Sequence, residues 1–281
     1  MTTDKAFERR VLGARDDGRA GPTVVITGGL HGNEPAGVIA ASRVFARLED
    51  ERIPVRGKVV GIAGNLGALA EGARYRVRDL NRGWTEAHIR ALGPDATGED
   101  FEQREMLRVM APLLAAAREP IVFLDLHSTS GGGAPFCCMA DVLRNRPLAF
   151  ALRVPVVLGL EEVIDGTMLG YLCDMGHAGV SLEGGQNDDP ETIRRHTSAI
   201  WLLLAAVGAI DPGDVADFDH HWKTLASETA RFPEVVEILH RHVVGPEDDF
   251  TMKPGQLSFD AVTKGQIVAR DVHGDIRTPE A

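Results

Sequence analysis

The chain has 281 residues, of which 44% are hydrophobic and 25% charged, and its formal net charge is −11. This length is sufficient for one large domain with a substantial core and one smaller domain. The acidic balance and the lack of a basic run argue against nucleic acid as a partner. The longest apolar run, residues 199–210, is too short to span a bilayer, so no membrane partner is expected.

The compartment is indicated by the chain start and the cysteines. Residues 1–5 are polar and show no secretory signal pattern. The three cysteines form neither a disulfide framework nor a Cys-x-x-Cys pair. We therefore expect a cytoplasmic protein. The sequence leaves open whether it forms a homo-oligomer.

Apolar runs and amphipathic segments alternate from residue 23 to about residue 209. The runs predict strands at 23–28, 58–63, 121–126, 154–158 and 179–182. Helical spacing predicts helices at 35–48, 101–117, 142–151, 167–175 and 190–209, and a long Gly- and Arg-rich loop extends to about residue 95. Because the strands are continuously apolar, we predict an α/β fold with a mixed, largely parallel sheet flanked by helices.

The remaining segment has a different pattern. Residues 211–214 (Asp-Pro-Gly-Asp) predict a boundary, and short strands are expected at 234–239 and 266–269 between Gly and Pro turns. We therefore expect two domains, at residues 1–212 and 213–281, the second small and β-rich. Its end at Ala281 is abrupt, so a minimal sheet and a natural chain that continues are both open.

Polar residues follow three of the predicted strands. His31 and Glu34 follow the first strand, His127 follows strand 121–126, and Glu183 follows strand 179–182. Two imidazoles and one carboxylate are the protein ligands of a catalytic zinc that keeps one position open for water. Ligands gather beyond the carboxyl ends of parallel strands, so these side chains are expected to converge. On spacing alone, unrelated loop histidines and a helix-start glutamate explain the pattern about equally well.

Four arginines lie within residues 74–82. Arginine binds carboxylates bidentately, and an adjacent amide can complete the clamp. Arg74 and Arg82 suit separate roles, one on a carboxylate and one on a developing oxyanion. A solvated loop that pairs with surface Asp and Glu is the alternative, and the motif alone favours it.

Two more carboxylates have candidate roles. Glu183 suits the general base that a zinc-activated water needs, and the two glycines after it would let the backbone approach the metal. A turn or capping glutamate is the alternative. Asp125 lies on the same strand face as His127, where it either orients a zinc histidine or pairs with an arginine.

Four motifs in this order resemble the succinylglutamate desuccinylase/aspartoacylase family, a branch of the zinc carboxypeptidase-like hydrolases. They are Gly-x-His-Gly-Asn-Glu at 29–34, Asp-Leu-Asn-Arg at 79–82, Asp-Leu-His-Ser at 125–128 and Leu-Glu-Gly-Gly-Gln at 182–186. The β-rich tail is also similar to the family's second domain. The resemblance implies a zinc carboxypeptidase-like domain with one Zn²⁺ that hydrolyses the amide of an N-acyl amino acid, a small-molecule substrate.

The resemblance also implies a role for each matching position. The matches are His31, Glu34 and His127 for the zinc ligands, Glu183 for the base, Arg74 for the arginine that polarises the scissile carbonyl, and Asn81 with Arg82 for the clamp on the α-carboxylate.

One departure from the family concerns the substrate. Family members that act on acylated aspartate carry an arginine shortly before the catalytic glutamate, but this chain has no Lys or Arg between Arg153 and Arg194. Acidic residues at 161, 162, 165 and 174 also argue against a substrate with a second carboxylate. We therefore expect a neutral or basic N-acyl amino acid rather than N-acetylaspartate or N-succinylglutamate. A carboxypeptidase for short peptides and a non-catalytic binding protein of the same fold are the alternatives.

Overall fold

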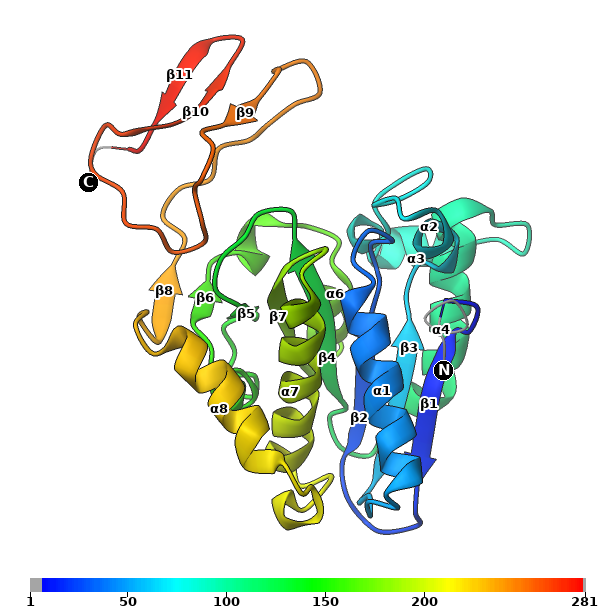
Figure 1. The fold of residues 1–281 in the computed structure, drawn as a ribbon. Helices are drawn as coiled ribbons and strands as arrows, with labels where there is room; N and C mark the ends of the chain where they lie inside the picture. Colours follow the sequence, from blue (N-terminus) through cyan, green and yellow to red (C-terminus); the bar gives the residue numbers. More distant parts are fainter. Residues whose placement is uncertain (1–6, 280–281) are drawn as a thin grey trace.

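The protein is an α/β structure, and the computed structural model describes residues 7–279 (Figure 1). In chain order the strands are β1 (Val11–Asp16), β2 (Thr23–Gly28), β3 (Lys58–Ala63), β4 (Val122–Thr129), β5 (Phe136–Cys138), β6 (Val156–Leu158), β7 (Ala178–Gln186), β8 (Val235–Glu237), β9 (Thr251–Met252), β10 (Ile267–Asp271) and β11 (Gly274–Arg277). The α-helices are α1 (Ala36–Asp50), α2 (Leu66–Glu71), α3 (Glu86–Ala91), α4 (Gly98–Ala116), α5 (Arg146–Ala151), α6 (Met168–Asp174), α7 (Pro190–Ala206) and α8 (Phe218–Thr229). Short 3₁₀ turns are η2 (Leu80–Arg82), η3 (Glu161–Val163) and η4 (Pro212–Asp214).

Within the described residues, the large sheet has eight strands in the order β1-β3-β2-β4-β7-β5-β6-β8. The central pairs β2–β3, β2–β4 and β4–β7 are parallel, and β1–β3 and β5–β7 are antiparallel. A separate antiparallel sheet, β11-β10-β9, lies near the C-terminus. The prediction of a mixed, largely parallel sheet with a small β-rich part is confirmed.

The two faces of the sheet carry separate apolar cores. Helices α1, α7 and α8 cover one face, and α4 and α6 cover the other (Figure 1). Val24 and Ile26 of β2 pack in the first core, whereas Val25 packs in the second, as the two-residue repeat of a strand requires. Burial on both faces explains why these strands are continuously apolar in the sequence.

The strand order determines where the candidate site lies. From β2 the chain crosses to β3 on one side of it and later to β4 on the other, so the order reverses between β2 and β4. Ligand sites of open α/β sheets form at such a switch point, beyond the carboxyl ends of the strands. His31 and Glu34 follow β2, and His127 lies near the end of β4, so all three lie at this position.

Several elements differ from the sequence prediction. β1 and β5 were not predicted, and α2 and α3 lie in the segment expected to be a loop. β4 and β7 run further than expected, so His127 and Glu183 lie inside strands rather than after them. Their polar last residues hid the ends of these strands, since the apolar pattern stops where the site begins.

The tail also begins differently from the expectation. Helix α8 packs beside α7, and β8 pairs in parallel with β6, so the chain after residue 212 first completes the large sheet. The small sheet starts only at β9. The predicted boundary rested on Asp-Pro-Gly-Asp at residues 211–214, which contains the short turn η4 before α8.

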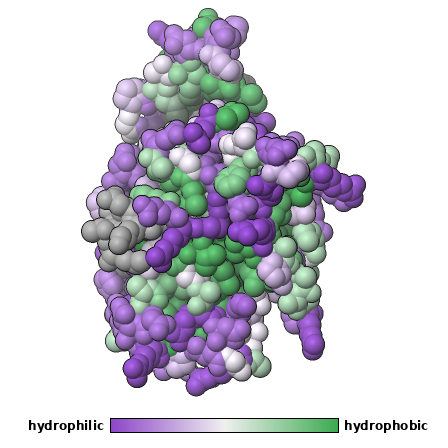
Figure 2. Space-filling model, turned by 90° about the vertical axis from the view of Figure 1, so that its right-hand side faces the viewer, coloured by the Kyte–Doolittle hydropathy of each residue, from purple (hydrophilic) through white to green (hydrophobic). Residues whose placement is uncertain are grey.

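The side of the molecule on which β1 forms the sheet edge is shown in Figure 2. Hydrophobic residues are visible in the middle of this face, and hydrophilic residues predominate below them. Of the helices between residues 7 and 279, none has both the length and the apolar character needed to cross a membrane.

Candidate active site

His31 and Glu34 are held by the loop that joins β2 to α1. The Glu34 amide donates to the His31 carbonyl (3.1 Å), which folds the loop so that His31 Nδ1 lies 2.8 Å from Glu34 Oε1. Gly32 allows this loop to pack against α2, because a Cβ there would lie 2.0 Å from the carbonyl carbon of Ala68. Both site side chains are buried.

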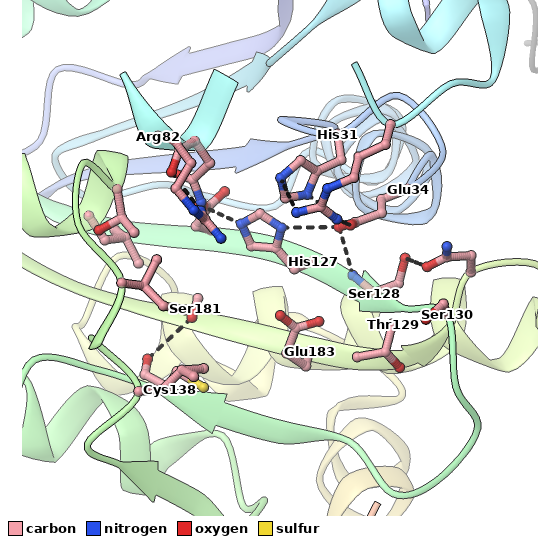
Figure 3. A pocket seen from close by; sticks show the side chains of 18 of the residues that line it. His31, Glu34, Arg82, His127, Ser128, Thr129, Ser130, Cys138, Ser181 and Glu183 are labelled. Atoms are coloured by element: carbon pink, nitrogen blue, oxygen red, sulfur yellow. Dashed lines mark hydrogen bonds and ion pairs between the residues drawn. The ribbon is translucent and has the colours of Figure 1, made fainter. Parts of the chain in front are cut away.

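His127 approaches the same carboxylate from β4. Its Nδ1 lies 3.0 Å from Glu34 Oε2, and its Nε2 lies 2.9 Å from Asp125 Oδ2 (Figure 3). Thr27 of β2 donates to the other Asp125 oxygen (2.6 Å). Of the two roles considered for Asp125, the geometry therefore agrees with orienting the histidine.

The ligand atoms of His31, Glu34 and His127 all lie within 4.8 Å of one another. Two imidazole nitrogens and a carboxylate form a donor set that suits Zn²⁺ and leaves a coordination position for water. In both histidines Nδ1 faces Glu34, and the outward Nε2 contacts an aspartate, which is the usual support of a metal-binding imidazole. The residues therefore fit a zinc ion.

The contacts between His31, Glu34 and His127 change the pKa values of these side chains. Burial alone would raise the pKa of Glu34, but hydrogen bonds with His127 and His31 outweigh it, so the pKa lies well below its ordinary value. Burial alone would lower the pKa of His31, and the contacts with Asp79 and Glu34 raise it instead. The two histidines thus stabilise Glu34 as an anion, and a carboxylate must be ionised to bind a metal.

Asp79 links the metal cluster to the arginine loop. Its Oδ1 lies 3.1 Å from His31 Nε2, and its Oδ2 accepts from Arg74 Nη2 (2.9 Å). Arg74 Nη1 is 3.5 Å from Glu34 Oε1, and the side chain remains 43% exposed. Arg74 therefore reaches the cluster from the rim of the site. Asp79 was not singled out by residue type in the sequence, although it opens the Asp-Leu-Asn-Arg motif.

The backbone of the arginine loop is held by Glu99 from the first turn of α4. Glu99 Oε1 accepts from the Arg76 amide (2.6 Å), and Oε2 accepts from the amides of Val77 (3.0 Å) and Arg78 (3.2 Å). Glu99 is buried, and its role was missed because acidic residues in the first turn of a helix are common for reasons of the helix dipole.

The four arginines of this loop are not equivalent. Arg76 pairs with Glu71 (2.8 Å), Arg78 pairs with Asp100 (2.5 Å), and Arg74 pairs with Asp79. Among the described residues, Arg82 forms no ion pair, and its Nη1 donates to the Asn81 carbonyl (2.7 Å). The solvated-loop interpretation thus fits Arg76 and Arg78, whereas Arg82 keeps an unpaired charge beside the site.

Asn81 is buried next to Arg82. Its Oδ1 accepts from the Met168 amide at the start of α6 (2.8 Å), and its own backbone amide donates to Asp79 Oδ1 (2.9 Å). Its side-chain nitrogen, Nδ2, donates no hydrogen bond to another described residue, so this amide remains available to a ligand in the cavity. Both Asn81 and Arg82 line the cavity described below.

Glu183 lies in β7 directly beside His127 of β4 in the strand register. Its side chain points from β7 toward His127 (Figure 3), and its Oε2 is buried without a hydrogen-bond partner. Burial raises the pKa of Glu183 to about 7, against the lowering effect of His127. A carboxyl group with this pKa exchanges protons readily near neutral pH.

Gly184 was expected to let the backbone approach a metal, but the structure gives a different reason for a glycine at this position. A Cβ at this position would lie 2.4 Å from Nε2 of His196 on α7, so the glycine permits α7 to pack closely on β7. His196 Nε2 in turn donates to the His127 carbonyl (2.8 Å). The glycine after Glu183 therefore supports the strand that carries the site rather than the approach of backbone to a metal.

A cavity of about 310 Å³ joins these groups. It is lined by all seven predicted site residues, namely His31, Glu34, Arg74, Asn81, Arg82, His127 and Glu183, and also by residues 128–130 and by Leu160, Glu161, Ile164 and Thr167. Cys138 lines it too, but burial raises the pKa of its thiol well above the ordinary value, which disfavours a thiolate nucleophile.

The histidines after residue 212 do not add a second metal centre. His221 contacts Ser198 Oγ (3.1 Å), and His242 lies 3.6 Å from Asp271. Over residues 7–279, the one group of His, Cys, Asp and Glu with metal-ligand geometry is the cluster of His31, Glu34 and His127.

Comparisons with known proteins agree with this geometry. Residues 20–203 match the family model described as succinylglutamate desuccinylase/aspartoacylase catalytic domain. The succinylglutamate desuccinylase of Pseudomonas paraeruginosa is 27% identical over 127 residues, which cover 45% of this chain and 36% of that protein. The match thus spans well under half the length of this curated relative.

Two solved structures share the fold. A succinylglutamate desuccinylase/aspartoacylase from Rhodobacter sphaeroides superposes with a TM-score of 0.65 at 22% identity, over 89% of this chain and 73% of that chain. The succinylglutamate desuccinylase from Chromobacterium violaceum gives a TM-score of 0.58 at 19% identity, over 94% and 82% of the two chains. With the family model covering most of the large sheet and its site, the chain belongs to the succinylglutamate desuccinylase/aspartoacylase family.

Proposed function

We propose that this protein is a zinc-dependent hydrolase that cleaves the amide bond of an N-acyl amino acid, and that the amino acid is neutral or basic. The observation that carries the proposal is the convergence of His31, Glu34 and His127 on one point, beside the buried, unpartnered carboxylate oxygen of Glu183. Family membership supports an activity of this class.

His31 Nδ1, Glu34 and His127 Nδ1 would hold the zinc. When bound, the ion supplies a Lewis acid that lowers the pKa of water and polarises a carbonyl oxygen. Asp79 and Asp125 keep the imidazoles in the orientation that presents Nδ1, because each contacts the opposite ring nitrogen.

Glu183 would act first as a general base and then as a general acid. Its free Oε2 accepts a proton from the attacking water, and the carboxyl group then donates that proton to the amine that leaves when the amide bond breaks. A pKa of about 7 suits both transfers near neutral pH, because neither the loss nor the gain of the proton is strongly uphill.

The two cavity arginines would stabilise the two negative charges of the reacting substrate. Arg74 lies within reach of the metal cluster, where negative charge develops on the carbonyl oxygen as the amide is attacked. Arg82, which forms no ion pair among the described residues, would bind the α-carboxylate together with the Asn81 amide.

This assignment leaves no cation for a second substrate carboxylate. Apart from the two metal-site histidines, Arg74 and Arg82 are the basic residues among the described lining of the cavity, and Glu161 lies in the same wall. A buried carboxylate without a partner is strongly disfavoured. The preference for a neutral or basic amino acid follows from this charge balance.

A carboxypeptidase for short peptides is the closest alternative, since the clamp of Asn81 and Arg82 suits any free α-carboxylate. A non-catalytic binding protein is a second alternative, which the retention of Glu183 beside a full ligand set disfavours.

One assay separates these three functions. The protein is incubated with N-acetyl amino acids, with dipeptides and with N-succinylglutamate, each with chelator and with added zinc. We expect zinc-dependent release of free amino acid from neutral or basic acetyl amino acids, by at least about tenfold over the acidic ones. Faster cleavage of dipeptides would identify the carboxypeptidase, and no turnover of any substrate would favour the binding protein.

A further inference from the structure

A second cavity of about 900 Å³ adjoins the candidate active site. The two cavities share Glu161, Ile164 and Thr167 in their linings. Five described lining residues of the second cavity are acidic, and none is Lys, Arg or His; the acidic residues are Glu86, Asp141, Glu161, Asp165 and Asp174. We call this space the acidic cavity.

Glu161 is half-buried, whereas the other four carboxylates of the acidic cavity are exposed. Glu86 pairs with Arg90 and Asp141 with Arg146 at the surface. Glu161 forms no ion pair among the described residues, and its Oε2 accepts only from the Thr167 hydroxyl (3.3 Å). Burial raises the pKa of Glu161, and the more distant charges of His127 and Arg82 offset this effect only in part. It lies where the two cavities meet.

The segment around Glu161 also packs against the proposed carboxylate clamp. Asn81 Oδ1 accepts from the Met168 amide (2.8 Å), and the Trp84 amide donates to the Gly166 carbonyl (3.0 Å). A Cβ on Gly166 would lie 2.4 Å from the Arg82 carbonyl oxygen, so residues 166–168 lie directly against the clamp. Glu161, Ile164 and Thr167 of this segment line the same cavity as Asn81 and Arg82.

The covalent structure of an amino acid relates the position of its side chain to that of its α-carboxylate. The side chain and the α-carboxylate are attached to the same carbon atom. If Arg82 holds that carboxylate, the side chain leaves the clamp next to residues 161–168 and toward the acidic cavity.

We propose that Glu161 is a specificity-determining residue, which forms an ion pair with a cationic group on the side chain of the substrate's amino-acid part. This inference rests on the proposed deacylase function and narrows its substrate class to acyl derivatives of amino acids that carry an ammonium or guanidinium group. Arg82 and Glu161 then bind the negative and the positive group of the same amino acid. The ion pair would stabilise the ionised form of this half-buried carboxylate.

Matched substrates test the charge without changing the shape. Nα-acetylornithine is compared with N-acetylnorleucine, in which a methyl group replaces the ammonium group, and Nα-acetylarginine is compared with Nα-acetylcitrulline. With the zinc-loaded wild-type protein, we expect kcat/KM to favour the cationic member of at least one pair by about tenfold or more. The pair with the larger ratio distinguishes an ammonium from a guanidinium substrate.

Two variants assign the preference to one carboxylate. Glu161→Gln keeps the size and the hydrogen bond to Thr167 but removes the charge, so kcat/KM should fall about tenfold for the cationic substrate and change less than about twofold for its neutral partner. Asp141→Asn removes the same charge from the rim of the acidic cavity, where Asp141 already pairs with Arg146, and should preserve the preference.

The outcomes separate the inference from the function on which it rests. Zinc-dependent hydrolysis without a preference for the cationic substrates, or equal losses on both members of a pair in Glu161→Gln, overturns the role of Glu161 and leaves the deacylase intact. No hydrolysis of any acyl amino acid overturns the function. Calorimetric titration with Nα-acetylornithine then decides the inference, which stands if binding weakens in Glu161→Gln and fails if there is no binding or no change.

Discussion

Two aspartates determine which ring nitrogen each site histidine presents to Glu34. Asp125 contacts Nε2 of His127, and Asp79 contacts Nε2 of His31, so Nδ1 is the nitrogen that faces Glu34 in both rings. Carboxylates in this position increase the basicity of a metal ligand and restrict its rotation. The metal affinity of the cluster should therefore depend on side chains that do not touch the metal.

Asp125→Asn tests this dependence at the residue scale. The amide keeps the size of the side chain but lacks its charge, so we expect zinc affinity to fall about 10- to 100-fold while the fold is retained. Competition with a chromophoric chelator measures the affinity, and circular dichroism checks the fold. The exposed Asp188→Asn serves as a control. Zinc affinity equal to that of the wild type would remove Asp125 from the support of the site.

Glu183→Gln tests the proposed base. The amide fills the same space but accepts no proton, so kcat should fall by about 10²- to 10⁴-fold, with one zinc per chain still bound. Metal analysis and steady-state kinetics are measured on the same preparation. Near-normal turnover would return Glu183 to a purely structural role in β7.

At the residue scale, residue types and motif order predicted that His31, Glu34 and His127 lie together, and the structure brings them together. Their role as metal ligands and the role of Glu183 as the base stay predictions. The supporting residues were harder to predict. Asp79 contacts His31, and Glu99 accepts from the amide of Val77, so each contact joins segments distant in the chain. A single carboxylate has many possible partners before the fold is known.

At the scale of elements, α7 supports the strands that carry the site. His196 of α7 is buried against β7, and its Nε2 donates to the backbone of His127. Its Nδ1 has no hydrogen-bond partner in the described structure. Burial lowers the pKa of His196 to about 4 from an ordinary value of 6.5. The folded protein therefore keeps this ring neutral at pH values at which the unfolded chain binds a proton.

A pH-dependent stability follows from this difference. Between pH 6.5 and pH 4 the unfolded chain carries more protons at His196, so its contribution to stability is present above pH 6.5 and is lost as the pH falls. From pH 8 to pH 5 we expect this group to lower the free energy of unfolding by about 2 kcal/mol.

Urea denaturation of the metal-free wild type and of His196→Gln measures that contribution. The glutamine amide can donate to the same carbonyl but does not titrate, so the variant should lose about 2 kcal/mol less stability than the wild type between pH 8 and pH 5. Other titrating groups cancel in the comparison. Equal losses in the two proteins would show that His196 does not control the acid sensitivity.

The sequence pattern predicted most long elements but not all short strands or strand ends. The central strands and the long helices α1, α4 and α7 were predicted because both faces of the sheet are buried and each helix has one apolar face. The short strand β5 was not, because three residues at an antiparallel position give no periodic signal. β4 and β7 were predicted too short, since their final residues are polar and interrupt the apolar pattern.

At the scale of the whole molecule, two parts of the chain meet near the site. The amide of Ser258, in the segment between β9 and β10, donates to the Gly132 carbonyl (3.2 Å) in the loop that follows β4. Phe259 packs against Phe136 of β5 and against Phe232. The small sheet is therefore anchored next to residues 128–130 of the cavity lining, a placement that no local pattern in the sequence predicts.

The central claim, that zinc bound by His31, Glu34 and His127 is required for deacylation, is tested most directly by titrating zinc into chelator-treated, metal-free protein while the hydrolysis of one N-acetyl amino acid is followed. We predict that activity is absent at the start, rises in proportion to added zinc and levels off near one equivalent per chain. His31→Ala should show no such rise under the same conditions. Full turnover by the metal-free protein, or a normal zinc response in His31→Ala, would contradict the claim.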